Sequence, residues 1–337
     1  VTGAAYRELV AACKQDGYAL PAVNITSSST MNAALEAAAN AGSDIIIQLS
    51  NGGAQFFAGK GIKGRLIGAA RLGLGTLKAR SRIKKVKPAA VIGFGGYASI
   101  PATMSAKWLG IPYAIHEQNA VLGRANRLVA NNAQRIATSF AKVTMIAPDD
   151  EAKVIWTGNP VRAGLVARAG QAPWDYRGDR PLRLLVLGGS LGAQALNELF
   201  PATLEQLAAA GVAVELWHQC GPAHGEAMAA RYAPLGEAAP RCAPYIEDMA
   251  GAYAWADLVL CRAGALTVAE LAVMGRPALL VPLPGAIDNH QYHNARFLAD
   301  RGAARLCPQD TLTPEAIARS IGELAGDAPR LAAMAAA

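Results

Sequence analysis

Short apolar runs alternate with helical patterns along most of this chain. Apolar runs of strand length cover residues 18–25, 44–50, 89–94, 112–116 and 135–139. Stretches with helical patterns separate them, at 5–16, 26–41, 64–85, 101–109 and 121–132. Strict alternation of this kind predicts a parallel sheet covered by helices on both faces, and therefore an α/β fold.

A second alternating series follows a proline-containing stretch at 141–181, which predicts an irregular linker. The second series is expected to begin with a strand at Leu182. Its later strands are predicted at 212–218, at 258–261 and up to Val281, and its helices at 222–233, 249–255, 289–301 and 314–325. A chain of 337 residues is long enough for about two domains, each with its own core. Its end, at 335–337, carries no capping signal, which we interpret as truncation.

The strongest chemical signal lies at residues 257–282. The pattern there predicts a buried strand at 258–261, a turn of small residues around Gly264 and a helix that opens at Leu266 or Thr267. A glycine turn lets backbone N–H groups approach a ligand, and the start of a helix favours an anion. Glu270 falls about one turn into this helix, where its carboxylate can accept hydrogen bonds from sugar hydroxyls. This segment therefore predicts a site for a nucleoside diphosphate.

Four further segments occupy the ends of predicted strands, where open α/β sheets bind ligands. They are Gly93–Ser99, His116–Asn119, Gly188–Ala193 and Asp288–Asn294. The two glycine-rich segments are equally compatible with tight turns that hold no ligand. The polar run at 116–119 would be costly if it were buried without partners, which favours a polar cleft edge. His290 and His293 might suggest a metal, but no carboxylate or cysteine completes a ligand set with them, so no metal is expected.

Composition narrows the functional classes further. Aromatic residues make up only 6% of the chain, which gives little support for a surface that stacks nucleic-acid bases. No apolar run reaches the roughly 18 residues of a membrane span, and no signal peptide is expected before the first helix. The five cysteines form no CxxC pair, which suits a reducing cytoplasm.

Positive charge is concentrated in one part of the chain. The net charge is +7, and no acidic residue occurs between Asp44 and Glu117. Basic residues at 60–87 are interleaved with leucine and isoleucine, which suits a basic amphipathic helix. Such a helix is compatible with a solvated surface or with an anionic membrane surface, where each basic residue adds on the order of 1 kcal/mol. Nucleic acid is a third and weaker alternative.

From about Gly59 onward the chain resembles the MurG family of N-acetylglucosaminyltransferases. The resemblance is carried by GKGIK, GFGGYAS, GIPYAIHEQN, GNPVR, GGSLGA, YIEDM, CRAGALTVAE and the polar run at 288–295. It implies a GT-B fold of two Rossmann-like domains with parallel sheets. It also implies metal-independent, inverting transfer of N-acetylglucosamine from UDP-N-acetylglucosamine to an undecaprenyl-linked muramyl-pentapeptide, at the cytoplasmic face of the inner membrane. No cofactor is implied, and the basic 60–87 segment would face the membrane.

The resemblance also implies roles for individual residues. Glu270 would hold the uridine ribose, and the backbone of Ile246 would contact uracil. Gln291 and Asn119 would contact the N-acetylglucosamine, and Arg162 would lie near the diphosphate. The remaining diphosphate contacts would be Ser190, Ala265, Leu266 and Thr267, and Val268 and Ala269 would be further substrate-binding residues.

The first 63 residues differ from that family. The family begins with a strand and a GGTGGH loop, whose histidine is the favoured general base, and this chain contains no such sequence. Residues 1–63 instead resemble the start of a class II fructose-bisphosphate aldolase, in YALPAVN and IIIQLSNGGAQFFAGKGIK. Asn24 and Ser50 would be substrate contacts in that family, but its zinc histidines are missing here. We therefore expect three parts: an aldolase-like βαβ fragment at 1–63, a partial N-terminal domain at 64–160 and a C-terminal donor-binding domain at 161–337.

Three functions remain open at this stage. The first is transfer of N-acetylglucosamine, impaired by loss of the GGTGGH loop. The second is binding of UDP-N-acetylglucosamine without turnover. The third, aldolase activity, rests on residues 1–63 without metal ligands.

Overall fold

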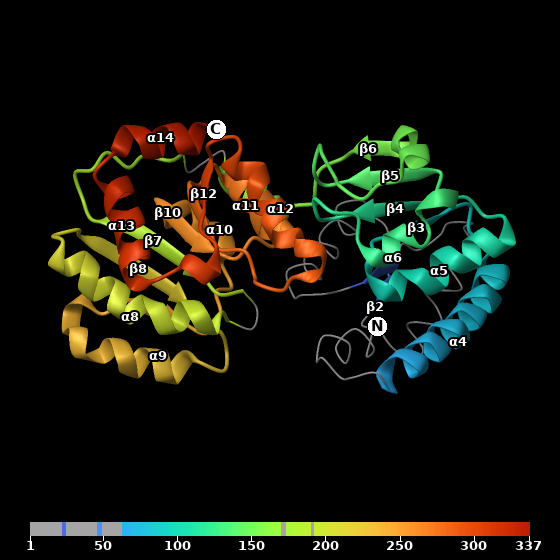
Figure 1. Cartoon of the computed structure of the whole chain (residues 1–337), viewed down its shortest axis with the longest axis horizontal. Coiled ribbons are helices and arrows are strands. Elements are labelled where there is room, and N and C mark those ends of the chain that lie inside the picture. The colour runs from blue at the N-terminus through green and yellow to red at the C-terminus, as the bar shows by residue number, and fades with distance from the viewer. Residues whose placement is uncertain (1–21, 25–45, 49–62, 170–172, 190–191) are drawn as a thin grey trace. The chain divides into compact units, whose positions relative to one another are not determined.

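The computed structural model describes residues 22–24, 46–48, 63–169, 173–189 and 192–337. The chain forms two compact units, residues 1–160 and 161–337, which are described separately (Figure 1). In the first unit, β1 (Ala22–Asn24) pairs in parallel with β2 (Ile46–Gln48). The helix expected between them, at 26–41, lies outside the described residues, as do Ser50 and the helix expected at 5–16. An aldolase-like fragment at 1–63, separate from 64–160, stays a prediction.

The main sheet of the first unit is parallel and four-stranded, with its strands in chain order. They are β3 (Val91–Gly93), β4 (Tyr113–Glu117), β5 (Arg135–Thr138) and β6 (Val154–Trp156). A core that includes Ile115 and Ile136, each fully buried, lies against this sheet. The predicted alternation of strands and helices is therefore confirmed for this region.

The helices of the first unit follow the predictions only in part. The helix expected at 64–85 is α4 (Lys63–Val86). α4 packs against α5, where Ser105 Oγ of α5 donates to Thr76 O of α4 at 2.9 Å. α5 (Gly96–Leu109) begins before the expected residue 101. Proline suits the first turn of a helix, but Pro101 lies inside this one.

The single helix expected at 121–132 is wrong. This stretch forms only α6 (Arg124–Arg127) and the 3₁₀ turn η1 (Ala130–Asn132). Tertiary hydrogen bonds take the N–H groups at its start, because Leu122 N donates to Thr144 O at 2.9 Å and Gly123 N to Glu117 Oε2 at 2.8 Å. Val121 also forms a parallel β-bridge with Thr144, and Gly123 is extended (φ −66°, ψ 155°), so the helix begins only at Arg124.

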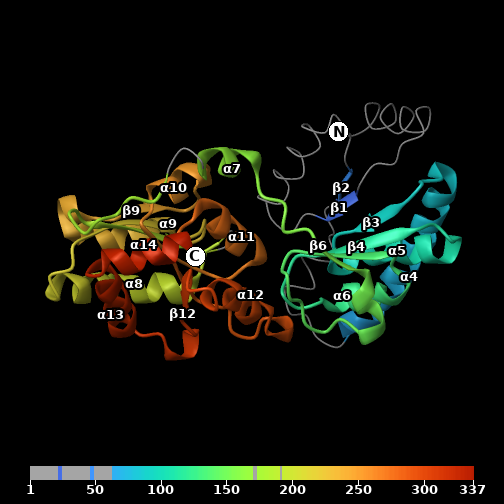
Figure 2. The ribbon, with the colours of Figure 1, turned by 90° about the horizontal axis from the view of Figure 1, so that it is seen from above.

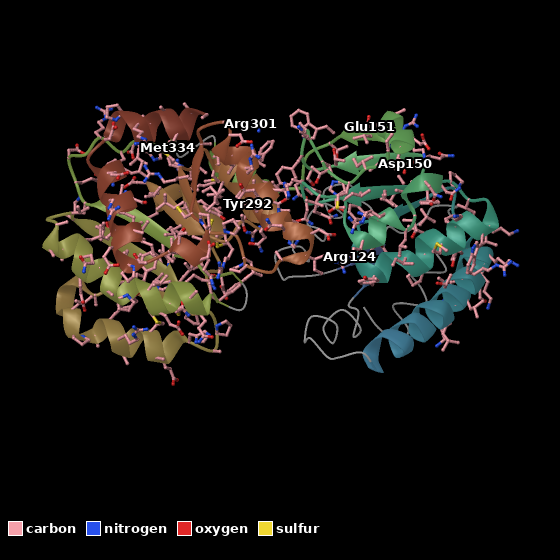
Figure 3. The ribbon with its side chains drawn as sticks, in the orientation of Figure 1. Arg124, Asp150, Glu151, Tyr292, Arg301 and Met334 are labelled. Carbon is pink, nitrogen blue, oxygen red and sulfur yellow. The ribbon has the colours of Figure 1, made fainter. Side chains whose placement is uncertain are left out.

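The irregular linker expected at 141–181 is also wrong in part. It contains the 3₁₀ helix η2 (Pro148–Lys153), strand β6 and helix α7 (Ala163–Ala169). Asp150 and Glu151 lie on η2 (Figure 3), and buried Asp150 pairs with Lys153 Nζ at 2.6 Å. β6 has only three residues, and two of them are exposed. Its apolar pattern is therefore too short to predict a strand.

The second unit is a six-stranded parallel sheet with the order β12-β11-β10-β7-β8-β9. Its strands are β7 (Leu182–Leu187), β8 (Val214–Gln219), β9 (Arg241–Ala243), β10 (Leu258–Cys261), β11 (Ala278–Leu280) and β12 (Ala304–Leu306). The three-residue strands β9 and β12 were not predicted, again because they are short. The other strands agree with the predicted series.

Helices cover this sheet in two groups (Figures 1 and 2). α8 (Gln194–Ala209) packs beside α9 (Gly225–Tyr232) and α13 (Pro314–Ala325), while α10 (Met249–Trp255) and α11 (Ala265–Met274) pack against α7. α12 (His290–Ala299) lies beside α11, and α14 (Ala328–Ala336) follows α13. The core on the α8 and α13 side includes Leu184, Leu260 and Phe200, all fully buried.

Candidate functional site

The turn between β10 and α11 is held in place by its own Arg262 and by two side chains from other elements, Asn294 and Gln309. Asn294 Nδ2 of α12 donates to Ala263 O at 3.1 Å, and the Asn294 side chain is fully buried. Arg262 Nη1 donates to Val281 O at 3.3 Å, and its Nη2 donates to Gln309 Oε1 at 2.6 Å. Sequence reasoning missed these roles of Arg262, Asn294 and Gln309, because the contacts join positions up to 47 residues apart.

α11 begins at Ala265, and its N-cap, Gly264, gives it no side-chain cap. Gly264 has an ordinary extended backbone (φ −64°, ψ 146°), and a Cβ there would meet Thr267 Oγ1 at an unstrained 3.6 Å. The conformational freedom of glycine is therefore not required here. What a glycine provides is open space beside the N–H groups of the first helical turn, where partial positive charge accumulates.

Glu270 is buried within α11, with a relative exposure of 8%, and two side chains hold its carboxylate. Tyr253 of α10 donates from its hydroxyl to Glu270 Oε2 at 3.1 Å. Arg162, which directly precedes α7, places Nη2 3.4 Å from Glu270 Oε1. Burial raises the pKa of Glu270, and the charge of Arg162 opposes that shift. The two candidate residues Glu270 and Arg162 are thus brought together, and Tyr253 joins them.

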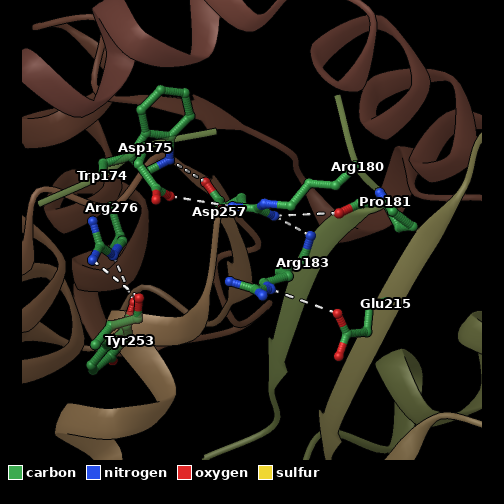
Figure 4. Close-up of polar contacts among 10 residues, drawn as sticks. Trp174, Asp175, Arg180, Pro181, Arg183, Glu215, Tyr253, Asp257 and Arg276 are labelled. Carbon is green, nitrogen blue, oxygen red and sulfur yellow. Dashed lines mark hydrogen bonds and ion pairs between the residues drawn. The ribbon is translucent and has the colours of Figure 1, made fainter. Parts of the chain in front are cut away.

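Asp257, at the start of the same segment, has a different role (Figure 4). Its carboxylate is 2% exposed and accepts from Arg180 Nη2 at 2.9 Å and from the backbone N–H of Arg183 at 2.8 Å. These bonds fasten the start of β10 to the start of β7. Asp257 is therefore a structural carboxylate.

The glycine-rich turn after β7 is shaped by its neighbours. Gly192 has a φ of 80°, and a Cβ there would come within 2.2 Å of Cys220 O. Gln219 exchanges two hydrogen bonds with Gly189, at 3.0 Å to its N and 2.8 Å to its O. Close packing against the end of β8 thus explains Gly192 without a ligand, which was one of the two alternatives. Ser190 lies outside the described residues.

The remaining candidates of the second unit lie on separate elements. Gln291, near the start of α12, accepts from Leu283 N at 3.0 Å, and it lies one turn before Asn294. Ile246 is 4% exposed, just before α10. Val268 is buried, whereas Ala265, Leu266, Thr267 and Ala269 are half-buried. Among the described residues, no group of three or more His, Cys, Asp or Glu side chains is arranged to hold a metal.

A hollow of about 400 Å³ in this unit lies away from these residues. Arg301 and Met334 line it, next to the end of α14 (Figure 3). It contains none of the predicted site residues, so volume alone does not identify the candidate site.

The polar run at the end of β4 forms the candidate site of the first unit. Glu117 is 3% exposed. Its Oε1 accepts from Asn119 N at 3.0 Å and Asn119 Nδ2 at 3.2 Å, and its Oε2 accepts from Gly123 N and Asn126 Nδ2, both at 2.8 Å. One carboxylate therefore folds the segment 117–126 and fixes the orientation of Asn119.

His116 has both ring nitrogens engaged. Nε2 lies 3.2 Å from Gly158 O, and Nδ1 lies 3.0 Å from Gln118 Nε2. Because a carbonyl only accepts, Nε2 carries the proton, and Nδ1 accepts from Gln118. Burial lowers the pKa of His116, so the ring is neutral at pH 7. This arrangement leaves the ring no lone pair with which to remove a proton from a substrate.

Sequence models of both domains of glycosyltransferase family 28 match this chain. The C-terminal domain matches residues 183–337, and the N-terminal domain matches residues 27–138. The second match includes 27–63, part of the stretch that resembles class II aldolases. The aldolase resemblance of 1–63 stays a prediction.

Curated relatives and solved structures give the same assignment. Proteins from Dechloromonas aromatica and Aeromonas hydrophila are both 47% identical, over 77% and 82% of this chain and 71% and 74% of their own. Both are named UDP-N-acetylglucosamine–N-acetylmuramyl-(pentapeptide) pyrophosphoryl-undecaprenol N-acetylglucosamine transferase. The crystal structure of MurG from Acinetobacter baumannii is 35% identical, with a TM-score of 0.69 over 98% of this chain and 89% of that one. The chain therefore has the GT-B fold and belongs to the MurG branch of glycosyltransferase family 28.

Proposed function

We propose that this chain transfers N-acetylglucosamine from UDP-N-acetylglucosamine to undecaprenyl-pyrophosphoryl-N-acetylmuramyl-pentapeptide, in peptidoglycan synthesis. The names of its relatives support both substrates. The observation that carries the proposal is the position of Glu270, a buried carboxylate in a helix whose N-terminus has no side-chain cap. This combination suits a ligand with an anionic diphosphate and a ribose.

The donor contacts follow from charge and hydrogen-bonding capacity. The N-terminus of α11 favours the diphosphate, with Ala265, Leu266 and Thr267 in its first turn. Glu270 Oε1 accepts a hydrogen bond from a ribose hydroxyl. Arg162 then leaves the Glu270 carboxylate and pairs with the diphosphate. The same helix end stabilises the UDP leaving group as the acceptor hydroxyl attacks the anomeric carbon with inversion. Ile246, Gln291, Asn119 and Ser190 complete the proposed contacts, to uracil, to the transferred sugar and to the diphosphate.

Turnover by this chain is expected to be slow. The sequence contains no GGTGGH loop, and His116, the first residue of the polar run of the first unit, has both ring nitrogens engaged. General base catalysis contributes typically 10²–10⁴-fold to a rate. We therefore expect donor binding to be retained and the rate of transfer to be reduced by about that factor.

The chain is also proposed to act at an anionic membrane surface on the cytoplasmic side. α4 exposes Leu74 and Leu77, at 61% and 58%, among basic residues that end with Lys84 and Lys85 in its last turn. α5, which packs against α4, exposes Trp108 at 51%. Exposed apolar side chains among cations suit a lipid interface. Within the part of the chain that the structure describes, no helix is long and apolar enough to cross a membrane.

One assay set tests the proposal. Titration calorimetry with UDP-N-acetylglucosamine measures donor binding, and UDP release in the presence of the lipid-linked acceptor measures transfer. We expect binding together with slow, acceptor-dependent release of UDP, and Glu270→Ala should abolish the binding. Unchanged donor affinity in Glu270→Ala would contradict the ribose contact. Donor binding without UDP release would show a donor-binding protein that does not transfer the sugar. Zinc-dependent cleavage of fructose bisphosphate would overturn both the transferase and the donor-binding proposals.

A further inference from the structure

The donor contacts leave one feature of this site without a role, the buried hydroxyl of Tyr253. The Tyr253 side chain is fully buried on α10, and its hydroxyl reaches Glu270 Oε2 at 3.1 Å. Arg162 stands 3.4 Å from the other oxygen, Oε1. The two carboxylate oxygens therefore have different environments, one fixed within the unit and one beside an arginine that is 16% exposed.

The backbone of Tyr253 is fixed as well. Arg276, 3% exposed, donates from Nε to Tyr253 O at 2.6 Å and from Nη2 to Ala254 O at 3.4 Å (Figure 4). At its start, α10 is capped by the Asp248 side chain, which accepts from Gly251 N at 2.8 Å. Tyr253 thus presents its hydroxyl from a helix that is held at both ends.

The protonation states suit a donor and an acceptor. Burial keeps the pKa of Tyr253 well above its usual value, so the phenol stays protonated and donates. Glu270 has a pKa raised by burial and lowered by Arg162 and by the Tyr253 hydrogen bond, so the hydroxyl favours the carboxylate form. A carboxylate with one oxygen held this way keeps a single orientation and offers the other oxygen to a ligand.

We propose that Tyr253 is the positioning residue that orients Glu270 for the ribose hydroxyls of the donor. The proposal rests on the ribose contact assigned to Glu270 above and adds the group that holds the carboxylate in place. Tyr253 itself does not contact the donor; it acts through Glu270.

The test compares two nucleotides that differ only at the ribose. Calorimetry with the full chain would measure the affinities for UDP and for 2′,3′-dideoxy-UDP, which lacks both hydroxyls. In Tyr253→Phe, which keeps the ring and removes one oxygen, we expect the affinity for UDP to fall about tenfold, as loss of a hydrogen bond to a charged group predicts. The affinity for dideoxy-UDP should stay within about twofold, because the ribose hydroxyls are the groups concerned.

Tyr232→Phe is the matched control. Tyr232 is 2% exposed in the same unit, and its hydroxyl lies 2.8 Å from His218 Nδ1. This substitution removes an equally buried phenolic oxygen with a polar partner, so it measures the general effect of such a loss on the unit. Both nucleotides should bind Tyr232→Phe as they bind the unmodified chain.

The outcomes separate this proposal from the one on which it rests. Tyr253→Phe could lower the affinities for UDP and dideoxy-UDP equally, or change neither affinity, while Glu270→Gln removes the preference for UDP. The positioning role would then be wrong, and the ribose contact would stand. If Glu270→Gln also leaves the preference for UDP unchanged, the ribose contact fails and the role of Tyr253 fails with it. Selective loss of UDP binding in both variants supports both proposals.

Discussion

Glu117, at the end of β4, and Glu270, in the helix α11 that follows β10, are both buried carboxylates, one in each unit, yet they are used in opposite ways. Glu117 accepts four hydrogen bonds from its own segment, two at each oxygen. Glu270 accepts one bond from Tyr253, and its other oxygen faces Arg162. The first carboxylate is saturated by the fold, whereas the second is paired with a cation that a phosphate can draw away.

The difference shows how to distinguish a glutamate that stabilises the fold from a glutamate that binds a ligand. Four donors from a single segment leave a carboxylate no capacity for a ligand, and their loss would release the segment. A partly exposed arginine at 3.4 Å is a weaker partner, because its hydrogen bond is long. The same substitution at the two positions should therefore affect stability in one unit and ligand binding in the other.

The largest expected effect is that of Glu117→Gln on stability. Either orientation of the new amide places its NH₂ group against two N–H donors, since Gly123 N and Asn126 Nδ2 share one oxygen and Asn119 supplies both donors to the other. We expect the first unit to lose about 3 kcal/mol, as buried donors without acceptors predict. Denaturant unfolding, followed as separate transitions for the two units, would measure this loss. A change below about 1 kcal/mol would show that the segment folds without the carboxylate.

Glu270→Gln should give the opposite result, a loss of donor affinity with little loss of stability. The stability of the second unit should change by less than about 1 kcal/mol, because the amide oxygen still accepts from Tyr253. The affinity for UDP-N-acetylglucosamine should fall roughly 10- to 100-fold, since a charged acceptor for the ribose is lost. Calorimetry and unfolding of the same preparation provide the two numbers. A loss of stability without a loss of affinity would assign Glu270 to the fold, like Glu117.

The sequence predicted much of this comparison and missed its decisive part. Alternating apolar runs are sufficient to predict parallel sheets, because strands buried on both faces are apolar throughout, as Leu258–Cys261 is. The three-residue strands β6, β9 and β12 carry no such pattern, and only neighbouring strands define them.

The candidate site shows the same limit. Glu270 was found because it lies within a local strand–turn–helix pattern. The roles of Tyr253, Asn294 and Gln219 were missed, because each acts on a residue at least 17 positions away and only the folded chain brings them together. The opposite roles of Glu117 and Glu270 likewise depend on how many donors surround each carboxylate.

Arg162→Ala tests whether Arg162, the partner of Glu270 Oε1, controls the protonation of that carboxylate. Arg162 opposes the rise in the pKa of Glu270, so its removal should raise that pKa further. Because the carboxylate form accepts the ribose hydroxyl, donor affinity should increase as pH rises through this pKa. The pH of half-maximal affinity should therefore be higher in Arg162→Ala, with affinity at pH 7 about tenfold lower.

Arg162→Lys, which keeps the charge, is the control for this shift. UDP-N-acetylglucosamine is the suitable ligand, because its diphosphate is esterified at both ends and does not titrate near neutral pH. An unshifted pH profile in Arg162→Ala would show that the arginine does not influence the carboxylate.

The smallest expected effect concerns the histidine beside Glu117. Burial lowers the pKa of His116 below its usual 6.5, so the folded chain binds this proton less readily than the unfolded chain. As pH falls from 6.5 toward the folded pKa, the unfolded state takes up the proton first, and the first unit should lose stability by at most about 1.4 kcal/mol per pH unit. Glu270 gives the opposite sign: its raised pKa stabilises the second unit as pH falls through the folded value. Comparing the chain with His116→Asn between pH 7 and pH 5 isolates the histidine, because all other titrating groups are shared. Equal slopes in the two proteins would mean that His116 takes up its proton as readily in the folded chain as in the unfolded chain, and that its bonds to Gly158 and Gln118 do not hold it neutral.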